Sequence, residues 1–166
     1  MNTIYKSTAF LFLANYPFMM KRLIILPFLA ILFSFSNWHY NLQEAQQIAQ
    51  QKHRCILLNF SGSDWCGPCI RLHKEIFASP VFTQFADTAL VMVNADFPRM
   101  GKNQLPAKQQ AINDALADKY NSRGAFPLTV LLDANGKVLQ EWDGFPKGSV
   151  DGFISDVKAA MNVIPN

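Results

Sequence analysis

Three cysteines are too few to hold a chain of 166 residues together as a disulfide-linked scaffold. The sequence also lacks a tract rich in cysteine and histidine, and it contains no repeat at the period of a solenoid. Half of the residues are hydrophobic, which is enough for a buried core. These features predict one globular domain and exclude disulfide-scaffold and repeat architectures.

Acidic residues are absent from the first 36 positions. Lys6, Lys21 and Arg22 therefore account for the whole net charge of +3, and the rest of the chain has 12 basic and 12 acidic residues. A near-neutral body has no electrostatic footprint for DNA or RNA, so we expect no nucleic-acid partner.

A basic and apolar segment precedes this neutral body. Lys21-Arg22 is followed by the run LIILPFLAILFSFS, which ends in small residues. A basic flank before an apolar run of this length is typical of a signal peptide. We predict that residues 1–36 are a signal peptide or a membrane anchor, with Met20 as an alternative start. Residues 37–166 then form a domain that is periplasmic or otherwise exported.

The pattern of hydrophobic residues after position 40 predicts alternating helices and strands. Asn41 and Ser79 are suited to cap helices, and Asn135-Gly136 predicts a hairpin turn. Strands separated by helices favour parallel pairing, whereas the hairpin is antiparallel, so we expect an α/β fold with a mixed central sheet flanked by helices. The expected helices are 41–51, 66–77, 79–85, 107–120 and one from Ser149, and the expected strands are 55–60, 89–97 and the two hairpin strands. The apolar face expected for helix 107–120 consists of Ala111, Ile112, Ala115 and Leu116.

Cys66 and Cys69 are separated only by Gly67 and Pro68. If a helix begins at Cys66, the two Cα atoms lie about 5 Å apart, which is within the range that a disulfide spans. The loop closed by this bond is too small to constrain the unfolded chain much. A structural bridge is therefore poorly motivated, and a redox-active pair is favoured.

The start of a helix favours Cys66 as the reactive thiolate, because unpaired N–H groups and the helix dipole stabilise negative charge there. Cys69, one turn further on, is expected to be better shielded and to resolve a mixed disulfide. Gly67 keeps the approach to Cys66 open, and Pro68 loses no hydrogen bond in the first turn. Trp65 offers a flat apolar surface beside the pair.

The pentapeptide WCGPC at positions 65–69 resembles the active site of the thioredoxin superfamily, and CILLNF and GAFPLTVLL match the pattern of the same family. The N-terminal segment, SGSDWC and KEIFASPVF are similar to exported bacterial members described as thiol:disulfide interchange proteins or disulfide isomerases. The resemblance covers residues 41–162 and implies the thioredoxin fold. It also implies that Pro127 is a cis proline facing the cysteines, and that the backbone of Phe126 pairs with an extended substrate.

Several positions depart from the family pattern. Asn59 stands where the family usually carries a buried acid on the strand before the cysteines, so a proton relay through this position is not expected. The segment 97–123 is longer than in a minimal thioredoxin, and Arg99 and Lys102 within it are interpreted as solvated loop residues. His73 is interpreted as a partly buried helix residue and as a candidate modulator of the cysteine pKa.

The expected function is thiol–disulfide exchange on proteins outside the cytoplasm, leaning towards reduction or isomerisation. The redox-active Cys66–Cys69 disulfide requires no bound cofactor, and electrons are exchanged with an unidentified membrane or soluble redox partner. Three alternatives remain open: a copper- or other metal-handling module using the two cysteines and His73, a dedicated reductant for cytochrome c maturation, and a binding protein with idle cysteines. Cys55 begins an apolar strand and is expected to be an inert buried thiol.

Overall fold

The computed structural model describes residues 38–162, so the predicted signal segment lies outside the described residues. The described elements, in chain order, are β1 (Trp38–His39), α1 (Leu42–Lys52), β2 (Cys55–Ser61), α2 (Gly67–Leu72), the π-helical turn η1 (His73–Phe77), α3 (Pro80–Ala89), β3 (Leu90–Asp96), the 3₁₀ turn η2 (Gly101–Asn103), α4 (Ala107–Tyr120), β4 (Leu128–Leu132), β5 (Val138–Asp143) and α5 (Val150–Met161).

The five strands form one sheet in the order β1-β3-β2-β4-β5. β3 pairs in parallel with both β1 and β2, whereas β4 is antiparallel to both β2 and β5. The prediction of a mixed sheet that closes with an antiparallel hairpin is therefore confirmed. β1 was not predicted, because a strand of two residues is too short to show a period in the sequence.

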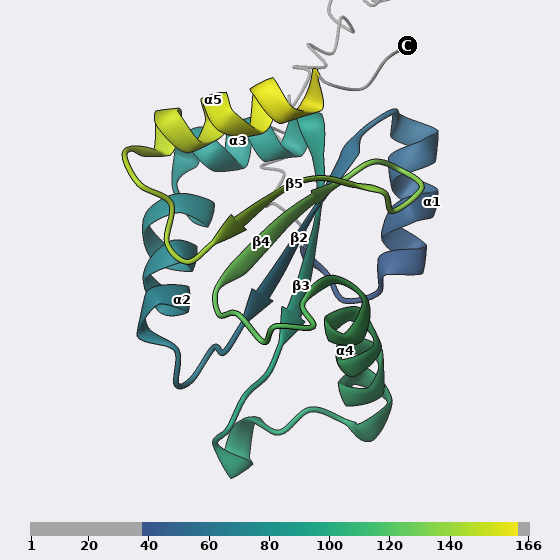
Figure 1. Cartoon of the computed structure of the whole chain (residues 1–166), viewed down its shortest axis with the longest axis vertical. Helices are drawn as coiled ribbons and strands as arrows, with labels where there is room; N and C mark the ends of the chain where they lie inside the picture. The colour runs from purple at the N-terminus through teal and green to yellow at the C-terminus, as the bar shows by residue number, and fades with distance from the viewer. Residues whose placement is uncertain (1–37, 163–166) are drawn as a thin grey trace, which may run out of the picture. The chain divides into compact units, whose positions relative to one another are not determined.

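Helices cover both faces of the sheet (Figure 1). One hydrophobic core lies between the sheet and the pair α1 and α4, and it includes Ala45, Ala49 and Leu116. A second core lies between the other face and the group α2, η1, α3 and α5, and it includes Phe82 and Phe153. No helix among residues 38–162 is long and apolar enough to cross a membrane.

The starts of α1 and α3 are set by local capping, as the sequence predicted. The side chain of Asn41 accepts hydrogen bonds from the backbone N–H groups of Gln43 and Glu44, and the Ser79 hydroxyl accepts one from Phe82. The carboxylate of Glu44 lies 3.6 Å from His39. The N-terminus of α1 is therefore fixed by Asn41 together with a contact to β1.

The segment 66–77, predicted as one α-helix, is α2 followed by η1. The N–H of Ala78 donates to the carbonyl of His73 at 2.8 Å, five residues back, which is the hydrogen bond of a π-turn. The following helix, α3, ends at Ala89 and not at the predicted Phe85. Ala86 is buried one turn after Phe82, so packing against the core extends this helix beyond the predicted end.

The buried face of α4 agrees only in part with the predicted one, since Leu116 is buried and Ile112 packs against the core as expected. Ala111 and Ala115 are exposed, whereas Asn113, Leu116 and Tyr120 are buried. Asn113 is a polar residue that the apolar pattern could not place in the core. Its side-chain N–H donates to the carbonyl of Asp96 at 2.7 Å, which satisfies the buried amide and fixes the rotation of the helix.

Candidate active site

Cys66 and Cys69 lie at the end of the central strand β2, at the start of α2. Cys66 is the N-cap residue of α2, and its Cα atom is 5.2 Å from that of Cys69, close to the distance expected from the sequence. The two sulfur atoms are joined in a disulfide. The helix start therefore holds the two residues in a geometry that permits the bond to open and close with little backbone movement.

A backbone hydrogen bond distinguishes the two sulfur atoms. The N–H of Cys69 donates to Sγ of Cys66 at 3.3 Å, so this sulfur occupies the position of a helix-capping acceptor. The same N–H group can stabilise a thiolate on Cys66. Burial does not separate the two residues, because each is 4% exposed. The expectation that Cys69 is the better shielded cysteine is therefore not met, and the distinction depends on the cap.

Gly67 and Pro68 occupy the first turn of α2 and are both exposed. A Cβ atom at Gly67 would meet nothing within 4 Å, so this position leaves open space beside the disulfide. Pro68 lies where its missing N–H costs no helical hydrogen bond. Neither residue places a charge or a side-chain donor next to the sulfurs.

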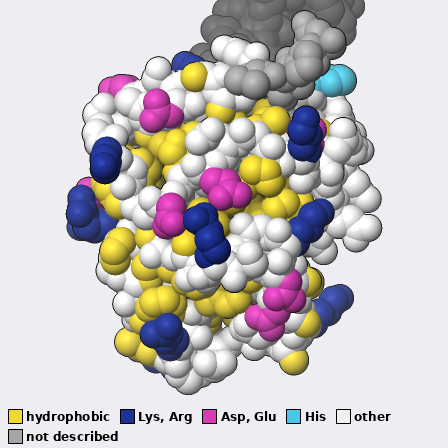
Figure 2. All heavy atoms as spheres, viewed as in Figure 1, with side chains coloured by type: hydrophobic (Ala, Val, Ile, Leu, Met, Phe, Trp, Pro, Cys, Tyr) yellow, Lys and Arg dark blue, Asp and Glu magenta, His cyan; other side chains and the backbone are white. Residues whose placement is uncertain are grey.

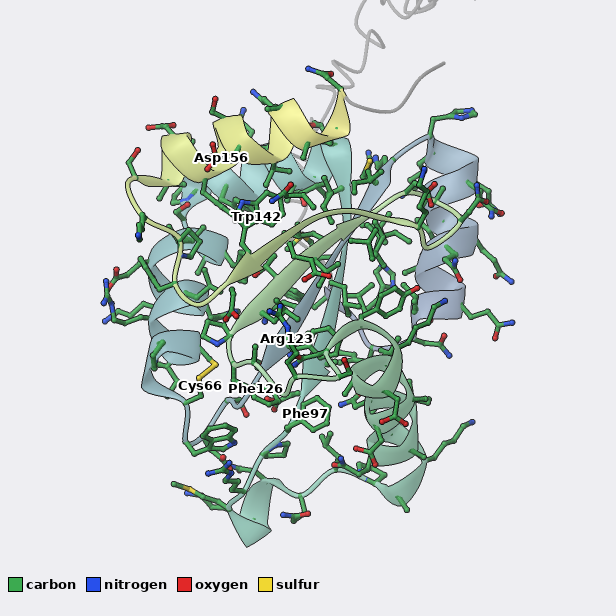
Figure 3. All side chains as sticks on the ribbon, in the orientation of Figure 1. Cys66, Phe97, Arg123, Phe126, Trp142 and Asp156 are labelled. Carbon is green, nitrogen blue, oxygen red and sulfur yellow. A yellow bond between two sulfur atoms is a disulfide. The ribbon has the colours of Figure 1, made fainter. Side chains whose placement is uncertain are left out.

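The peptide bond between Phe126 and Pro127 is cis, as the family resemblance implied. Pro127 is buried, and its carbonyl accepts a hydrogen bond from the N–H of Gly144 at 2.9 Å. The ring of Phe126 packs edge-on against Trp65, the neighbour of Cys66, with centroids 5.5 Å apart. Figure 3 shows Cys66 and Phe126 towards the same end of the sheet, away from Trp142 and Asp156.

Trp65 is held on several sides. Its indole N–H donates to the carbonyl of Phe97 at 2.7 Å, and the guanidinium carbon of Arg99 lies 3.5 Å from the centre of its ring. On another side the ring lies against the backbone of Gly62. The predicted flat surface beside Cys66 is thus an indole ring in contact with the guanidinium of Arg99 and with the backbone of Gly62. Arg99, interpreted from the sequence as a solvated loop residue, is an exposed residue whose guanidinium is ordered by this stacking.

Gly62→Ala is expected to destabilise the protein by about 1–3 kcal/mol, because a Cβ atom there overlaps the rigid Trp65 ring. Gly101→Ala is the matched control, since a Cβ atom at Gly101 meets nothing within 4 Å. Urea unfolding of both variants in the disulfide state measures the difference. Equal midpoints for the two variants would show that the ring can move aside at no cost.

Asn59, on β2, is 5% exposed. Its amide donates to Oδ1 of Asn94 at 3.1 Å, and its own Oδ1 accepts from the hydroxyl of Thr129 at 3.4 Å. Ser61 donates to Asn94 at 3.2 Å and to the carboxylate of Asp96 at 3.1 Å. The position that carries an acid in most of the family is here a neutral amide, within a hydrogen-bonded group that spans β2, β3 and β4 and ends at the carboxylate of Asp96.

The longer segment after β3 is attached to the turn before the cysteines by Asp64. This carboxylate accepts from the backbone N–H groups of Arg99 and Met100 at 2.9 and 3.0 Å, and from the side chain of Asn103 at 2.9 Å. These hydrogen bonds, above all that from Arg99, lower the pKa of Asp64. The sequence did not reveal this role, because the partners of Asp64 are 35 to 39 residues away.

His73 is exposed on η1, not partly buried as interpreted from the sequence, and its ring lies 6.2 Å from that of Trp38. Among residues 38–162, no group of three or more His, Cys, Asp or Glu side chains could hold a metal ion. The alternative in which His73 completes a metal site with the two cysteines is therefore not supported. Cys55 is buried, and this burial, aided by the charge of Asp133, raises the pKa of its thiol, as expected for an inert cysteine.

Comparisons with known proteins agree with this geometry. Residues 42–150 match the model of a thioredoxin-like domain family. The chain is 40% identical over 120 residues to the disulfide bond reductase DsbH of Chlamydia pneumoniae, covering 72% of this chain and 70% of that protein.

Solved structures give the same result. The structure of a DsbH oxidoreductase is similar with a TM-score of 0.71 and 36% identity, covering 79% of this chain and 88% of that one. A thioredoxin from Thermus thermophilus has a TM-score of 0.55 at 16% identity, covering 75% and 86% of the two chains, and shows likeness of fold alone. The chain belongs to the thioredoxin-like family and is a thiol–disulfide oxidoreductase.

Proposed function

We propose that the protein reduces disulfide bonds in other proteins outside the cytoplasm, with Cys66 as the attacking sulfur and Cys69 as the resolving one. The observation that carries the proposal is the Cys66–Cys69 disulfide at the start of α2, with Sγ of Cys66 accepting the N–H of Cys69. The 40% identity to a disulfide bond reductase supports the direction of the reaction.

The reaction consists of two thiol–disulfide exchanges. In the reduced protein the Cys66 thiolate attacks a substrate disulfide, which forms a mixed disulfide and releases one substrate thiolate that takes up a proton. The Cys69 thiol then loses its proton and attacks Sγ of Cys66, which releases the second substrate thiol. Two electrons have moved to the substrate, and the enzyme is left with the Cys66–Cys69 disulfide. A dithiol of a redox partner must then reduce this disulfide again.

The cis-proline segment offers a surface for the substrate backbone. Phe126 precedes the cis Pro127, and its ring packs against Trp65, the residue before Cys66. We propose that an extended substrate segment pairs with the backbone at Phe126, in the manner of an added strand. Pro127 shapes the end of this surface.

The residues between the cysteines favour the reducing direction. A strongly oxidising pair needs donors or positive charge that stabilise the reduced thiolate, and Gly67 and Pro68 supply neither. Neutral Asn59 does not repel a thiolate as a buried acid would, and this works modestly in the opposite direction. We expect the dipeptide to dominate.

The test combines an assay of disulfide reduction with a measurement of the reduction potential of the Cys66–Cys69 pair. With dithiothreitol as electron source, residues 37–166 should accelerate the reduction of insulin disulfides. Equilibration with glutathione buffers should give a potential near the reducing end of the range of about −270 to −120 mV found for such pairs. Absence of insulin reduction, or a potential near −120 mV, would contradict the reductase function.

Export is proposed from the sequence of residues 1–36, with its Lys21-Arg22 flank and apolar run. A reductase in such a compartment requires a partner that carries electrons across or within the membrane. Amino-terminal sequencing of the exported protein is expected to find a start close to residue 37. A chain that keeps Leu23–Phe33 and sediments with membranes would instead indicate an uncleaved anchor.

A further inference from the structure

The loop between β3 and α4 lies against the turn that precedes the cysteines. Asp64 binds it through three hydrogen bonds, and Trp65 binds it through the carbonyl of Phe97. Figure 3 shows Phe97 towards the same end of the sheet as Cys66. The start of this longer segment is therefore placed against Asp64 and Trp65, the two residues that precede Cys66.

We propose that Arg99 determines substrate specificity, by binding a carboxylate that lies close to the reacting cysteine of a substrate polypeptide. The proposal rests on the proposed function and adds a substrate class to it: disulfides flanked by acidic residues. The guanidinium lies over the face of Trp65, the residue before Cys66.

Stacking on Trp65 prepares the guanidinium for this contact. The distance of 3.5 Å to the ring centre means that the flat face of the group is occupied by the indole. The N–H donors of a guanidinium point outwards in its plane, so its edge remains able to bind a carboxylate with two hydrogen bonds. Because Trp65 is itself fixed by Phe97 and Phe126, little side-chain entropy is lost on binding.

The charge of Arg99 is not used within residues 38–162. Its side chain makes no ion pair there, whereas Arg71 pairs with Glu75 and Arg123 pairs with Glu141. Asp64 is close in space, but its oxygens accept hydrogen bonds from the loop backbone and from Asn103. An unpaired, preorganised cation beside the reaction centre is complementary to an acidic substrate.

The surroundings of Arg99 are apolar. Met100 is 49% exposed, and Trp65, Phe97 and Phe126 form a connected set of rings. Figure 2 shows a Lys or Arg side chain among hydrophobic atoms at the lower end of the molecule, in the region of the loop between β3 and α4. Such a surface fits a polypeptide that combines an acidic residue with apolar neighbours, and not a highly charged polymer.

The experiment compares two peptides. Each contains one cysteine joined through a disulfide to 2-mercaptoethanol, which carries no charge. The two peptides differ only by Glu or Gln at one position, and the comparison is repeated for each position within three residues of the cysteine. We expect kcat/KM to be about threefold to fivefold higher for the Glu peptide at the best position at low salt, and the ratio to approach one at 1 M salt. Arg99→Gln should bring the ratio of kcat/KM between the Glu and Gln peptides to one, and Arg99→Glu should reverse it.

Lys119→Gln is the matched control, because Lys119 also lies over an aromatic ring, that of Tyr120. The Tyr120 hydroxyl donates a hydrogen bond to the carbonyl of Gly136 in the turn between β4 and β5. Lys119→Gln should keep the preference of the wild type. Asp64→Ala, which removes the hydrogen bonds that hold the backbone of Arg99 and Met100, should lower the ratio of kcat/KM between the Glu and Gln peptides. The rate of Cys66 alkylation as a function of pH should be the same in Arg99→Gln and wild type.

The outcomes separate the two proposals. If the wild type reduces neither peptide, the proposed function itself fails. If it reduces both at equal rates at every position tested, the reductase function stands and the role of Arg99 is overturned. Equal slowing of both peptides by Arg99→Gln, with a shifted alkylation profile, would make Arg99 a stabiliser of the thiolate and would also overturn its role in specificity.

Discussion

Cys66→Ser is expected to lower the rate of disulfide reduction by more than about 10³-fold, to the rate of the uncatalysed exchange, because it removes the N-cap thiol of α2, the sulfur that accepts the N–H of Cys69. Cys69→Ser should behave differently. It still attacks the substrate through Cys66, but nothing releases the mixed disulfide, so a covalent enzyme–substrate complex should accumulate in one turnover.

Mass spectrometry of the two variants after incubation with an oxidised peptide distinguishes these results. Cys55→Ser is the matched control, since Cys55 is buried on β2 and its raised pKa leaves little thiolate near neutral pH. This variant should keep wild-type activity. A stable complex in Cys66→Ser, and none in Cys69→Ser, would reverse the roles of the two cysteines.

Asn59→Asp should produce the largest change in stability. The new carboxyl group lies in a site that is 5% exposed, with no cation among the hydrogen-bond partners of Asn59, which are Asn94 and Thr129. Desolvation disfavours the ionised form, so the pKa of the carboxyl group is raised on folding above about 3.9. We expect a loss of about 2–4 kcal/mol at pH 8 relative to the wild type, and a smaller loss at pH 4.

The direction of this pH dependence follows from the linkage between proton binding and folding. A group whose pKa is raised in the folded state binds more protons there, so the variant is relatively most stable below its unfolded-state pKa. Its free energy of unfolding then falls as the pH rises, and levels off above the folded-state pKa. Asn59→Leu is the control, because it removes the same hydrogen bonds without adding a titratable group. Parallel pH profiles for Asn59→Asp and Asn59→Leu would show that the site accommodates a negative charge.

Features governed by neighbouring residues could be predicted from the sequence. The caps Asn41 and Ser79 act on N–H groups two or three residues away. The spacing of Cys66 and Cys69 depends only on helix geometry, and the observed 5.2 Å agrees with the expected 5 Å. In these parts of the fold and of the site, the structure is determined by residues that are close together in the sequence.

Features governed by distant residues could not be predicted. The contacts of Asp64 join positions 35 to 39 residues apart, and Arg99 meets Trp65 only after the chain has folded back from β3. The rotation of α4 is set by the bond from Asn113 to the main chain of Asp96. No periodicity in the sequence records such contacts, since each depends on the tertiary fold and not on local propensity.

The two edges of the sheet bear on how the protein avoids aggregation. An exposed edge strand offers unpaired backbone groups to any neighbouring chain. At one edge, β1 is only two residues long, too short to template a second sheet. At the other, β5 carries Glu141 and Asp143, and its pairing with β4 is irregular at Leu131 and Leu132. Short length, charge and an irregular register are all means by which natural sheets discourage the addition of further strands. The protein can therefore reduce the disulfides of other chains without those chains pairing with the edges of its sheet.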